Sequence, residues 1–272
     1  MTDIAAVPLY THTDRIARGL AALGFGPVDP IAAADLWPLD QWHYHGAVAV
    51  CAAAERLGLG PGNHVLEIGS GVGGPARCLA CTTGCHVTAL ELQPELNAIA
   101  ADLTRRCGLS DRITHLRGDA LTEPLPEAGF DAVVSWLAFL HIPDRQRLLA
   151  RVASTLRAGG MLYVEDLTQR APFAPADRQA LHDVVFGVSV TTVPDYVADL
   201  RGAGFSDIAA ADMTHDWAPF AADRLRAWRA DRAAHVAVQG EGAYAAQEHF
   251  YAVIDHLFAS GSLGGARITA RK

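Results

Sequence analysis

The stretch from His64 to Gly74, HVLEIGSGVGG, constrains the fold of this chain more than any other segment. Its apolar half has the composition of a buried strand, and Pro75 with an alanine-rich run follows as a helix start would. The glycines between these parts allow unusual backbone angles and let a ligand approach the main chain closely. The segment therefore predicts a strand, a tight turn and a helix around a nucleoside-containing cofactor.

The glycine spacing fits two cofactor-binding patterns. Gly69, Gly71 and Gly74 satisfy G-x-G-x-x-G, which is typical of dinucleotide-binding folds. Together with Glu67, the glycines at 69, 71 and 73 satisfy E-x-G-x-G-x-G, which resembles the first motif of S-adenosylmethionine-dependent methyltransferases. A glycine turn that binds no cofactor is a third interpretation. The segments further along the chain have to decide between them.

Strands and helices alternate from position 64 onward, which predicts a doubly wound sheet with helices on both faces. We expect a Rossmann-like α/β fold with a mostly parallel, seven-stranded sheet. Right-handed crossovers then place the C-terminal ends of the parallel strands at one edge, where ligands bind. The expected strands cover residues 64–69, 86–92, 113–118, 130–136, 161–166, 205–213 and 263–270. The expected helices between them cover residues 75–83, 94–108, 143–157 and 194–203.

Polar residues follow several of these strands at the predicted edge. Glu91 ends the second strand about twenty residues beyond the glycine turn, where a carboxylate can accept hydrogen bonds from ribose hydroxyls. Asp119 and Ala120 follow the third strand, and Ser135 and Trp136 end the fourth. We expect a cofactor site that consists of Glu67, Gly69, Ser70, Gly71, Gly73, Glu91, Leu92, Asp119, Ala120, Ser135 and Trp136.

Several segments resemble successive motifs of class I, small-molecule S-adenosylmethionine-dependent methyltransferases. They are GDA after the third strand, FDAVVSWLAFLHIPD at the fourth, LRAGGMLYVED into the fifth, AGFSDI before the sixth and the closing GGARITARK. The resemblance covers residues 38–272 and is closest to sarcosine/dimethylglycine, tocopherol and bacterial sugar O-methyltransferases. It implies that Gly69 and Gly71 face the methionine part of the cofactor, Glu91 the ribose and Asp119-Ala120 the adenine.

The resemblance also implies an activity. The enzyme would transfer a methyl group from S-adenosyl-L-methionine to an oxygen, nitrogen or carbon atom of a small metabolite in natural-product metabolism, leaving S-adenosyl-L-homocysteine. The loop SWLAFLH lacks the N/D-P-P-Y/F motif of enzymes that methylate nucleic-acid amines, so that class is disfavoured. Three alternatives stay open: a methyltransferase fold recruited for cyclisation or isomerisation, an NAD(P)-dependent oxidoreductase, and a non-catalytic binding protein of this fold, which would be expected to lack polar groups such as His141 and Asp166.

His141 and Asp166 are the expected catalytic pair. His141 precedes the helix start Ile142-Pro143-Asp144, and Asp166 is expected to end the fifth strand, so both side chains would face the acceptor. A neutral imidazole can take a proton there, and a nearby carboxylate would hold its tautomer. The resemblance supports this pair, since some related sugar O-methyltransferases have a His and an Asp at matching positions. The alternative is that His141 packs against or caps the following helix.

We expect an N-terminal helical lid over residues 1–60 and a methyltransferase domain over residues 61–272, with cap insertions at 170–193 and 216–262. The segment WPLDQWHYHG is rich in aromatic and imidazole groups, which are common to cores and to ligand pockets. It either packs in the core or covers the site. As a lid it would present Trp42, His43 and Tyr44 to the substrate, with Glu165 as a further substrate contact. The second insertion carries aromatic residues at helix-like spacing, for which packing is the favoured interpretation: Trp217, Phe220, Trp228, Tyr244, Phe250, Tyr251 and Phe258.

Composition excludes several partners. A net charge of −8 provides no basic surface for nucleic acid. There is no apolar run of about 18 residues and no signal-peptide pattern, so we expect a cytoplasmic protein that does not bind membranes. Cys78, Cys81 and Cys85 form C-x2-C-x3-C with no fourth ligand nearby, so we expect buried free thiols and no metal. The expected partner is a small-molecule acceptor, and homodimer formation stays open.

Overall fold

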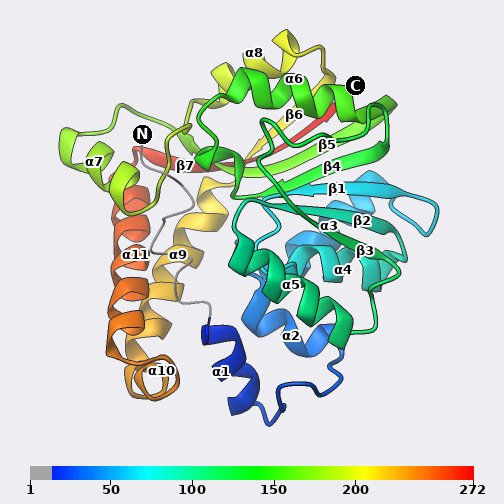
Figure 1. Cartoon of the computed structure of the whole chain (residues 1–272). Coiled ribbons are helices and arrows are strands. Elements are labelled where there is room, and N and C mark those ends of the chain that lie inside the picture. Colours follow the sequence, from blue (N-terminus) through cyan, green and yellow to red (C-terminus); the bar gives the residue numbers. More distant parts are fainter. Residues whose placement is uncertain (1–13) are drawn as a thin grey trace.

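The computed structural model describes residues 14–272, and residues 1–13 of the predicted lid lie outside that range. Its centre is a seven-stranded sheet with strand order β3-β2-β1-β4-β5-β7-β6 (Figure 1). The final strand, β7 (Leu263–Arg271), runs antiparallel to both of its neighbours, and the other pairings are parallel. The prediction of a Rossmann-like, mostly parallel sheet is therefore confirmed.

The first half of the sheet alternates strands with helices as the sequence predicts. Nearly every residue of β1 and β4 is buried, because both faces of these parallel strands are covered and both strands are rich in apolar residues. The glycine turn lies between the first strand and the helix that follows it. The elements are β1 (His64–Ile68), α4 (Gly74–Thr83), β2 (His86–Glu91), α5 (Pro94–Arg106), β3 (Ile113–Arg117) and β4 (Phe130–Trp136).

The fifth strand differs from its prediction. We expected it to end at Asp166, but β5 spans Leu156–Gln169. It pairs with β4 as far as Glu165, while its pairing with β7 continues to Gln169. Because successive side chains of a strand point to opposite faces, Glu165 and Asp166 lie under opposite helical layers and not at the open edge.

Two helical layers cover the sheet. Leu66 and Val164 pack with helices of one layer, and Val65 and Tyr163 pack with helices of the other (Figure 1). The first layer follows β4 and β5, with a short 3-10 turn, η3, in front of it. Its elements are η3 (Phe139–His141), α6 (Arg145–Thr155) and α8 (Val193–Gly202), and the edge strand β6 (Ser206–Asp212) follows α8 in the sheet. The second layer contains α4, α5 and α3 (Gly46–Leu57).

The N-terminal helices divide between two roles. Val50 and Ala53 of α3 pack against Leu79 of α4, so this helix belongs to the layer over the sheet. The two helices before it, α1 (Asp14–Ala22) and α2 (Ala33–Asp40), pack against α5 and the glycine turn. Only part of the predicted lid is therefore placed next to the ligand edge.

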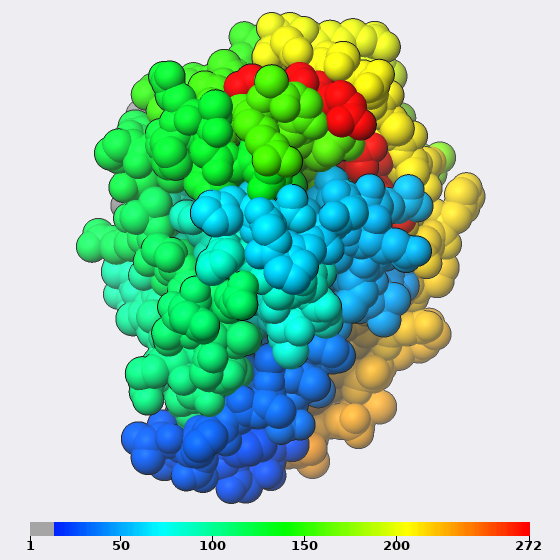
Figure 2. Space-filling model, turned by 90° about the vertical axis from the view of Figure 1, so that its right-hand side faces the viewer, coloured from blue at the N-terminus to red at the C-terminus, as the bar shows by residue number. Residues whose placement is uncertain are grey.

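The two predicted insertions form helices beside the sheet. After β5 comes α7 (Pro175–Asp183), and after β6 come α9 (Thr214–Ala230), α10 (Arg232–Gln239) and α11 (Glu241–Ala259). Figure 2 shows the first described residues, in blue, next to the orange insertion at one end of the molecule. Arg15 Nη1 donates to Gln247 Oε1 at 3.0 Å across this boundary. Within residues 14–272, no helix has the length and apolar character needed to cross a membrane.

Candidate active site

A cavity of about 1110 Å³ lies at the C-terminal edge of β1, β2 and β4 and reaches the helical insertions. Pockets for one drug-sized ligand measure about 300–1,000 Å³, so this one has room for a cofactor and a small acceptor. We call the lining residues within 67–75, 90–96 and 118–121 the sheet half of the cavity, and the lining residues within 140–143, 182–188 and 221–254 its cap half.

The glycine turn forms one wall of the sheet half. Gly69 has a φ of +76°, and a Cβ at this position would lie 2.2 Å from the Cβ of Ala138. Gly71 has a φ of +54°, but the nearest atoms to a Cβ there belong to the Trp42 ring, at 3.8 Å. The backbone of Gly71 is therefore open to the cavity beside the Trp42 ring, and a side chain here would fill that space and would also meet a left-handed backbone that L residues rarely adopt. This is the close approach to backbone that a bound cofactor requires.

Glu91 connects the end of β2 to the glycine turn. Its Oε2 accepts a hydrogen bond from the Gly71 amide at 2.8 Å, and its Oε1 accepts one from the Gln93 amide at 2.9 Å. Burial raises the pKa of this carboxyl, opposed by those two amides. Each carboxylate oxygen has a second lone pair, so Glu91 can also accept hydrogen bonds from ligand hydroxyls. After β3, Asp119 uses Oδ1 to accept from the Leu121 amide at 2.8 Å.

Two buried polar groups of the sheet half have no hydrogen-bond partner among residues 14–272. They are Oε2 of Glu67 and Oγ of Ser70, and both residues line the cavity. Burial raises the pKa of Glu67 from 4.5 to about 8, so this carboxyl is protonated at neutral pH. An unsatisfied buried polar group costs about 1–3 kcal/mol, which a polar ligand group would recover. The glycine wall, Glu91 and these two groups together fit an adenosyl cofactor with an amino-acid end.

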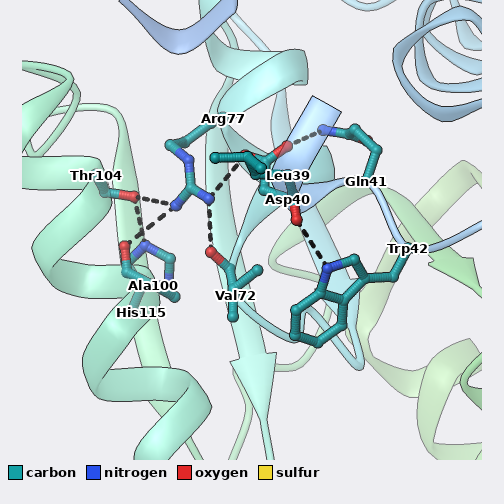
Figure 3. A network of polar contacts seen from close by, with 9 residues as sticks. All are labelled: Leu39, Asp40, Gln41, Trp42, Val72, Arg77, Ala100, Thr104 and His115. Carbon is teal, nitrogen blue, oxygen red and sulfur yellow. Dashed lines mark hydrogen bonds and ion pairs between the residues drawn. The ribbon is translucent and has the colours of Figure 1, made fainter. Parts of the chain in front are cut away.

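A buried ion pair ties α2 to the glycine turn (Figure 3). Arg77 Nη2 donates to Asp40 Oδ2 at 2.9 Å and to the Val72 carbonyl at 2.6 Å, and both charged side chains are inaccessible to solvent. Desolvation raises the pKa of Asp40, and the Arg77 guanidinium opposes that rise. Trp42 follows directly, donating from Nε1 to the Leu39 carbonyl at 2.9 Å. The pair therefore fixes the segment that places Trp42 beside Gly71.

His141 lies at the start of the cap half, at the end of η3. Its Nδ1 is 2.9 Å from the carbonyl oxygen of Phe186, so the neutral ring donates from Nδ1 and carries its lone pair on Nε2. Desolvation lowers the pKa of this imidazole, and the hydrogen bond to Phe186 opposes that shift. Phe186 and Leu137 both line the cavity with φ near +57°, an uncommon conformation for non-glycine residues. Such strain is concentrated at functional sites.

The structure brings neither Asp166 nor Glu165 into the cavity lining, which differs from the sequence-based prediction. Asp166 is fully buried, and its Oδ1 accepts from the Leu167 amide at 3.0 Å. Burial raises its pKa to about 7, while the nearby Arg145 opposes the shift. Glu165 accepts from Tyr163 Oη at 2.7 Å and from Arg267 Nε at 2.8 Å. The reason is the extension of β5 past both residues, which the sequence did not indicate.

Two further predicted residues have packing roles in this structure. Ser135 is fully buried, and its Oγ donates to the Ile68 carbonyl at 2.9 Å, joining β4 to β1. Gly73 has a φ of +78° and precedes α4, and a Cβ there would lie 2.9 Å from both Arg77 and His115. All the other predicted site residues line the cavity: Trp42, His43, Tyr44, Glu67, Gly69, Ser70, Gly71, Glu91, Leu92, Asp119, Ala120, Trp136 and His141.

The sequence did not single out Arg224, which lines the cap half from α9. A signal was available, because Phe220, Arg224 and Trp228 follow one another at intervals of four and therefore share one side of a helix. Of the aromatic residues predicted mainly to pack, three line the cavity: Trp228, Phe250 and Tyr251. Others support the cap, as where Tyr44 stacks on Trp217 with ring centroids 4.4 Å apart.

The cysteine motif lies away from this cavity. Cys78 and Cys81 are in α4, Cys85 follows that helix, and all three are free thiols. Cys78 and Cys85 are buried, whereas Cys81 is exposed. Over residues 14–272, no three His, Cys, Asp or Glu side chains are grouped so that they could hold a metal ion.

Comparison with known proteins relates this chain to methyltransferases. A family model described as a methyltransferase domain matches residues 66–164. Sarcosine/dimethylglycine N-methyltransferase of Halorhodospira halochloris is 35% identical over 159 residues, which are 58% of this chain and 56% of that protein. The 27-O-demethylrifamycin SV methyltransferase of Amycolatopsis mediterranei (strain S699) is 31% identical over 189 residues, which are 67% of this chain and 70% of that protein. The matches span 45% to 60% of the length of the first three curated relatives.

The fold has solved counterparts as well. Phosphoethanolamine N-methyltransferase 2 of Haemonchus contortus, in complex with phosphomonomethylethanolamine and S-adenosylhomocysteine, superposes with a TM-score of 0.79. The superposition covers 98% of this chain and 60% of that one, with 20% sequence identity. At this identity the likeness shows a shared fold.

Proposed function

This chain belongs to the class I, small-molecule S-adenosylmethionine-dependent methyltransferases, and on that premise we propose that it methylates a small acceptor bound in the cap half of its cavity. The observation that supports this proposal most directly is that a single cavity extends from the glycine turn to His141 and the helical insertions. Such a cavity can hold a methyl donor and an acceptor in contact while keeping water out. Alignment of this kind supplies much of the rate enhancement when the donor carbon is already activated.

The sheet half would hold S-adenosylmethionine, which supplies a methyl group on a sulfonium when bound. Gly69 and Gly71 would leave space for its amino-acid end, near the unpaired polar atoms of Glu67 and Ser70. Glu91 would accept hydrogen bonds from the ribose while it also holds the Gly71 amide. Asp119 and Ala120 would contact the adenine.

His141 would accept the proton that the acceptor loses. The hydrogen bond from Nδ1 to the Phe186 carbonyl orients the ring and makes Nε2 the basic atom. This role replaces the predicted His141–Asp166 pair, because a backbone carbonyl performs the orienting function that we assigned to the carboxylate. A proton acceptor of this kind suits a hydroxyl or an ammonium group better than a carbon acceptor that is already nucleophilic.

We place the acceptor in natural-product metabolism. The match to the 27-O-demethylrifamycin SV methyltransferase supports this assignment, since that relative's name specifies a small molecule with an oxygen position. The size of the cavity also supports a small molecule and not a polymer. Charge agrees, because a net charge of −8 does not favour a nucleic-acid substrate.

Binding and turnover measurements test this function together. Calorimetry with S-adenosylmethionine, S-adenosylhomocysteine and NAD should show binding of the first two and not of the third. The protein is then incubated with a methyl-labelled donor and a panel of hydroxylated and amino metabolites, and label transfer is followed by mass spectrometry. Binding of NAD alone would favour an oxidoreductase. Donor binding with conversion of a panel member into an isomer, without label, would favour a recruited cyclase or isomerase.

A further inference from the structure

The two halves of the cavity differ in charge. The carboxyl groups of its lining are those of Asp40, Glu67, Glu91 and Asp119, all near the glycine turn or the ends of β2 and β3. Among the lining residues of the cap half, the only side chain with a permanent charge is that of Arg224, and Arg15 of α1 is the other guanidinium of the cavity lining. An acceptor in the cap half therefore meets a cation and no carboxylate.

The guanidinium of Arg224 is surrounded by aromatic rings. Its carbon lies 4.6 Å from the ring centroid of Phe220, 5.4 Å from that of Tyr44 and 5.6 Å from that of Tyr251. Nη2 donates to the His43 carbonyl at 3.0 Å, which joins α9 to the segment before α3. The rings fix the plane of the guanidinium and remove part of its hydration.

Other arginines of α9 differ from Arg224 in their partners. Arg226 forms an ion pair with Asp223, and Arg229 forms one with Glu248 at 2.6 Å. Arg224 forms no ion pair with any carboxylate of residues 14–272, and its one hydrogen bond uses a single donor of the five that a guanidinium carries. A half-buried cation with unused donors is stabilised by an anion that reaches it.

We propose that Arg224 binds an anionic oxygen group, a carboxylate or a phosphate, on the methyl acceptor. The proposal rests on the proposed function, because it assigns a chemical class to the acceptor of that same site. The planar fork of the guanidinium matches two oxygens of such a group, and the surrounding rings accommodate an apolar or aromatic body. Arg224 is thereby a specificity residue that selects acids over their neutral analogues and over amines.

The test compares matched acids and amides. Wild-type protein saturated with S-adenosylhomocysteine is titrated with benzoate and benzamide, with 4-hydroxybenzoate and 4-hydroxybenzamide, and with phenyl phosphate. We expect the acids to bind about 10- to 100-fold more tightly than the amides, as expected for hydrogen bonds to a charged group. A preference for the carboxylates or for phenyl phosphate identifies which anion the site takes.

Variants assign the preference to one residue. Arg224→Gln should abolish it, Arg224→Lys should retain part of it, and Arg226→Gln, which removes an exposed arginine of the same helix, should retain all of it. Unchanged affinity of each variant for S-adenosylhomocysteine shows that the fold and the donor site persist. Equal binding of acids and amides, binding of neither, or an acid preference that survives in Arg224→Gln would overturn the proposal. Loss of S-adenosylhomocysteine binding in the wild type would instead overturn the proposed function.

Discussion

The sheet half and the cap half of the cavity are built in different ways. The sheet half comes from turns that directly follow β1, β2 and β3, and its ionisable groups are carboxyls. The cap half combines segments from η3, from α7 and the residues after it, and from α9, α10 and α11, and its permanent charge is the guanidinium of Arg224. The fold itself can therefore hold a cofactor at the sheet half, and on our proposal the acceptor is selected by the helices of the cap half.

The largest effect should come from Gly71→Val, which changes the sheet half and leaves the cap half as it is. Its side chain would enter the cavity beside the Trp42 ring, which is 3.8 Å from a Cβ at this position, and it would also strain a backbone whose φ is +54°. We expect binding of S-adenosylhomocysteine to fall below detection by calorimetry, with acid probes still bound in the cap half. Gly108→Val is the matched control, since Gly108 has a similar φ of +66°, a Cβ there meets nothing within 4 Å, and the residue lies outside the cavity. Cofactor binding at wild-type strength would mean that the glycine turn does not contact the cofactor.

His141→Ala tests the cap half by its chemistry. We expect turnover to fall by about 10²–10⁴-fold, the usual contribution of a positioned general base, with little change in cofactor affinity. Desolvation lowers the pKa of this imidazole, and only its neutral form accepts a proton. The wild-type turnover rate should therefore fall as the pH drops through a value below 6.5, because the imidazole becomes protonated. The pH–rate profile of the variant should not show this fall. His256→Ala, at an exposed imidazole paired with Asp177, is the control. Equal turnover across pH 5 to 9 would show catalysis by alignment alone.

Glu67→Gln tests how the buried carboxyl of Glu67 in the sheet half affects the pH dependence of folding stability. The folded protein holds this carboxyl protonated up to about pH 8, while the unfolded chain releases the proton near pH 4.5. The native state then binds more protons, so the stability of the wild type falls as the pH rises from 4.5 to 8. We expect the variant to lack this fall and to be more stable than the wild type by roughly 2–4 kcal/mol at pH 8. Denaturant-induced unfolding of both proteins at pH 4 and pH 8 gives the free energies of unfolding. The same change between the two pH values in the wild type and the variant would contradict this prediction.

Glu91→Ala should give the smallest effect, and it tests whether the two halves bind their ligands independently. Removing this hydrogen-bond acceptor should weaken the binding of S-adenosylhomocysteine by about 1–3 kcal/mol, because the ribose hydroxyls and the Gly71 amide lose a charged partner. The acid preference of the cap half should stay unchanged, the reverse of the result expected for Arg224→Gln. Glu95→Ala, in the first turn of α5, serves as the control. An unaltered Kd would place the ribose elsewhere.

The sequence by itself determined the sheet half. Each of its residues lies within a few positions of a strand end, and parallel strands bring their C-terminal ends to one edge whatever the details of packing. The alternation of strands and helices therefore predicted the fold. The glycine turn, Glu91 and Asp119 could be placed from the same pattern.

Tertiary structure alone decided the cap half. The carbonyl that orients His141 belongs to Phe186, 45 positions away, and the carbonyl that holds Arg224 belongs to His43, 181 positions away. Pairing with β7 likewise extended β5 past Asp166 and buried the carboxylate that the sequence assigned to catalysis. Contacts between distant segments depend on how helices pack and how long strands stay paired, and no short sequence pattern encodes either.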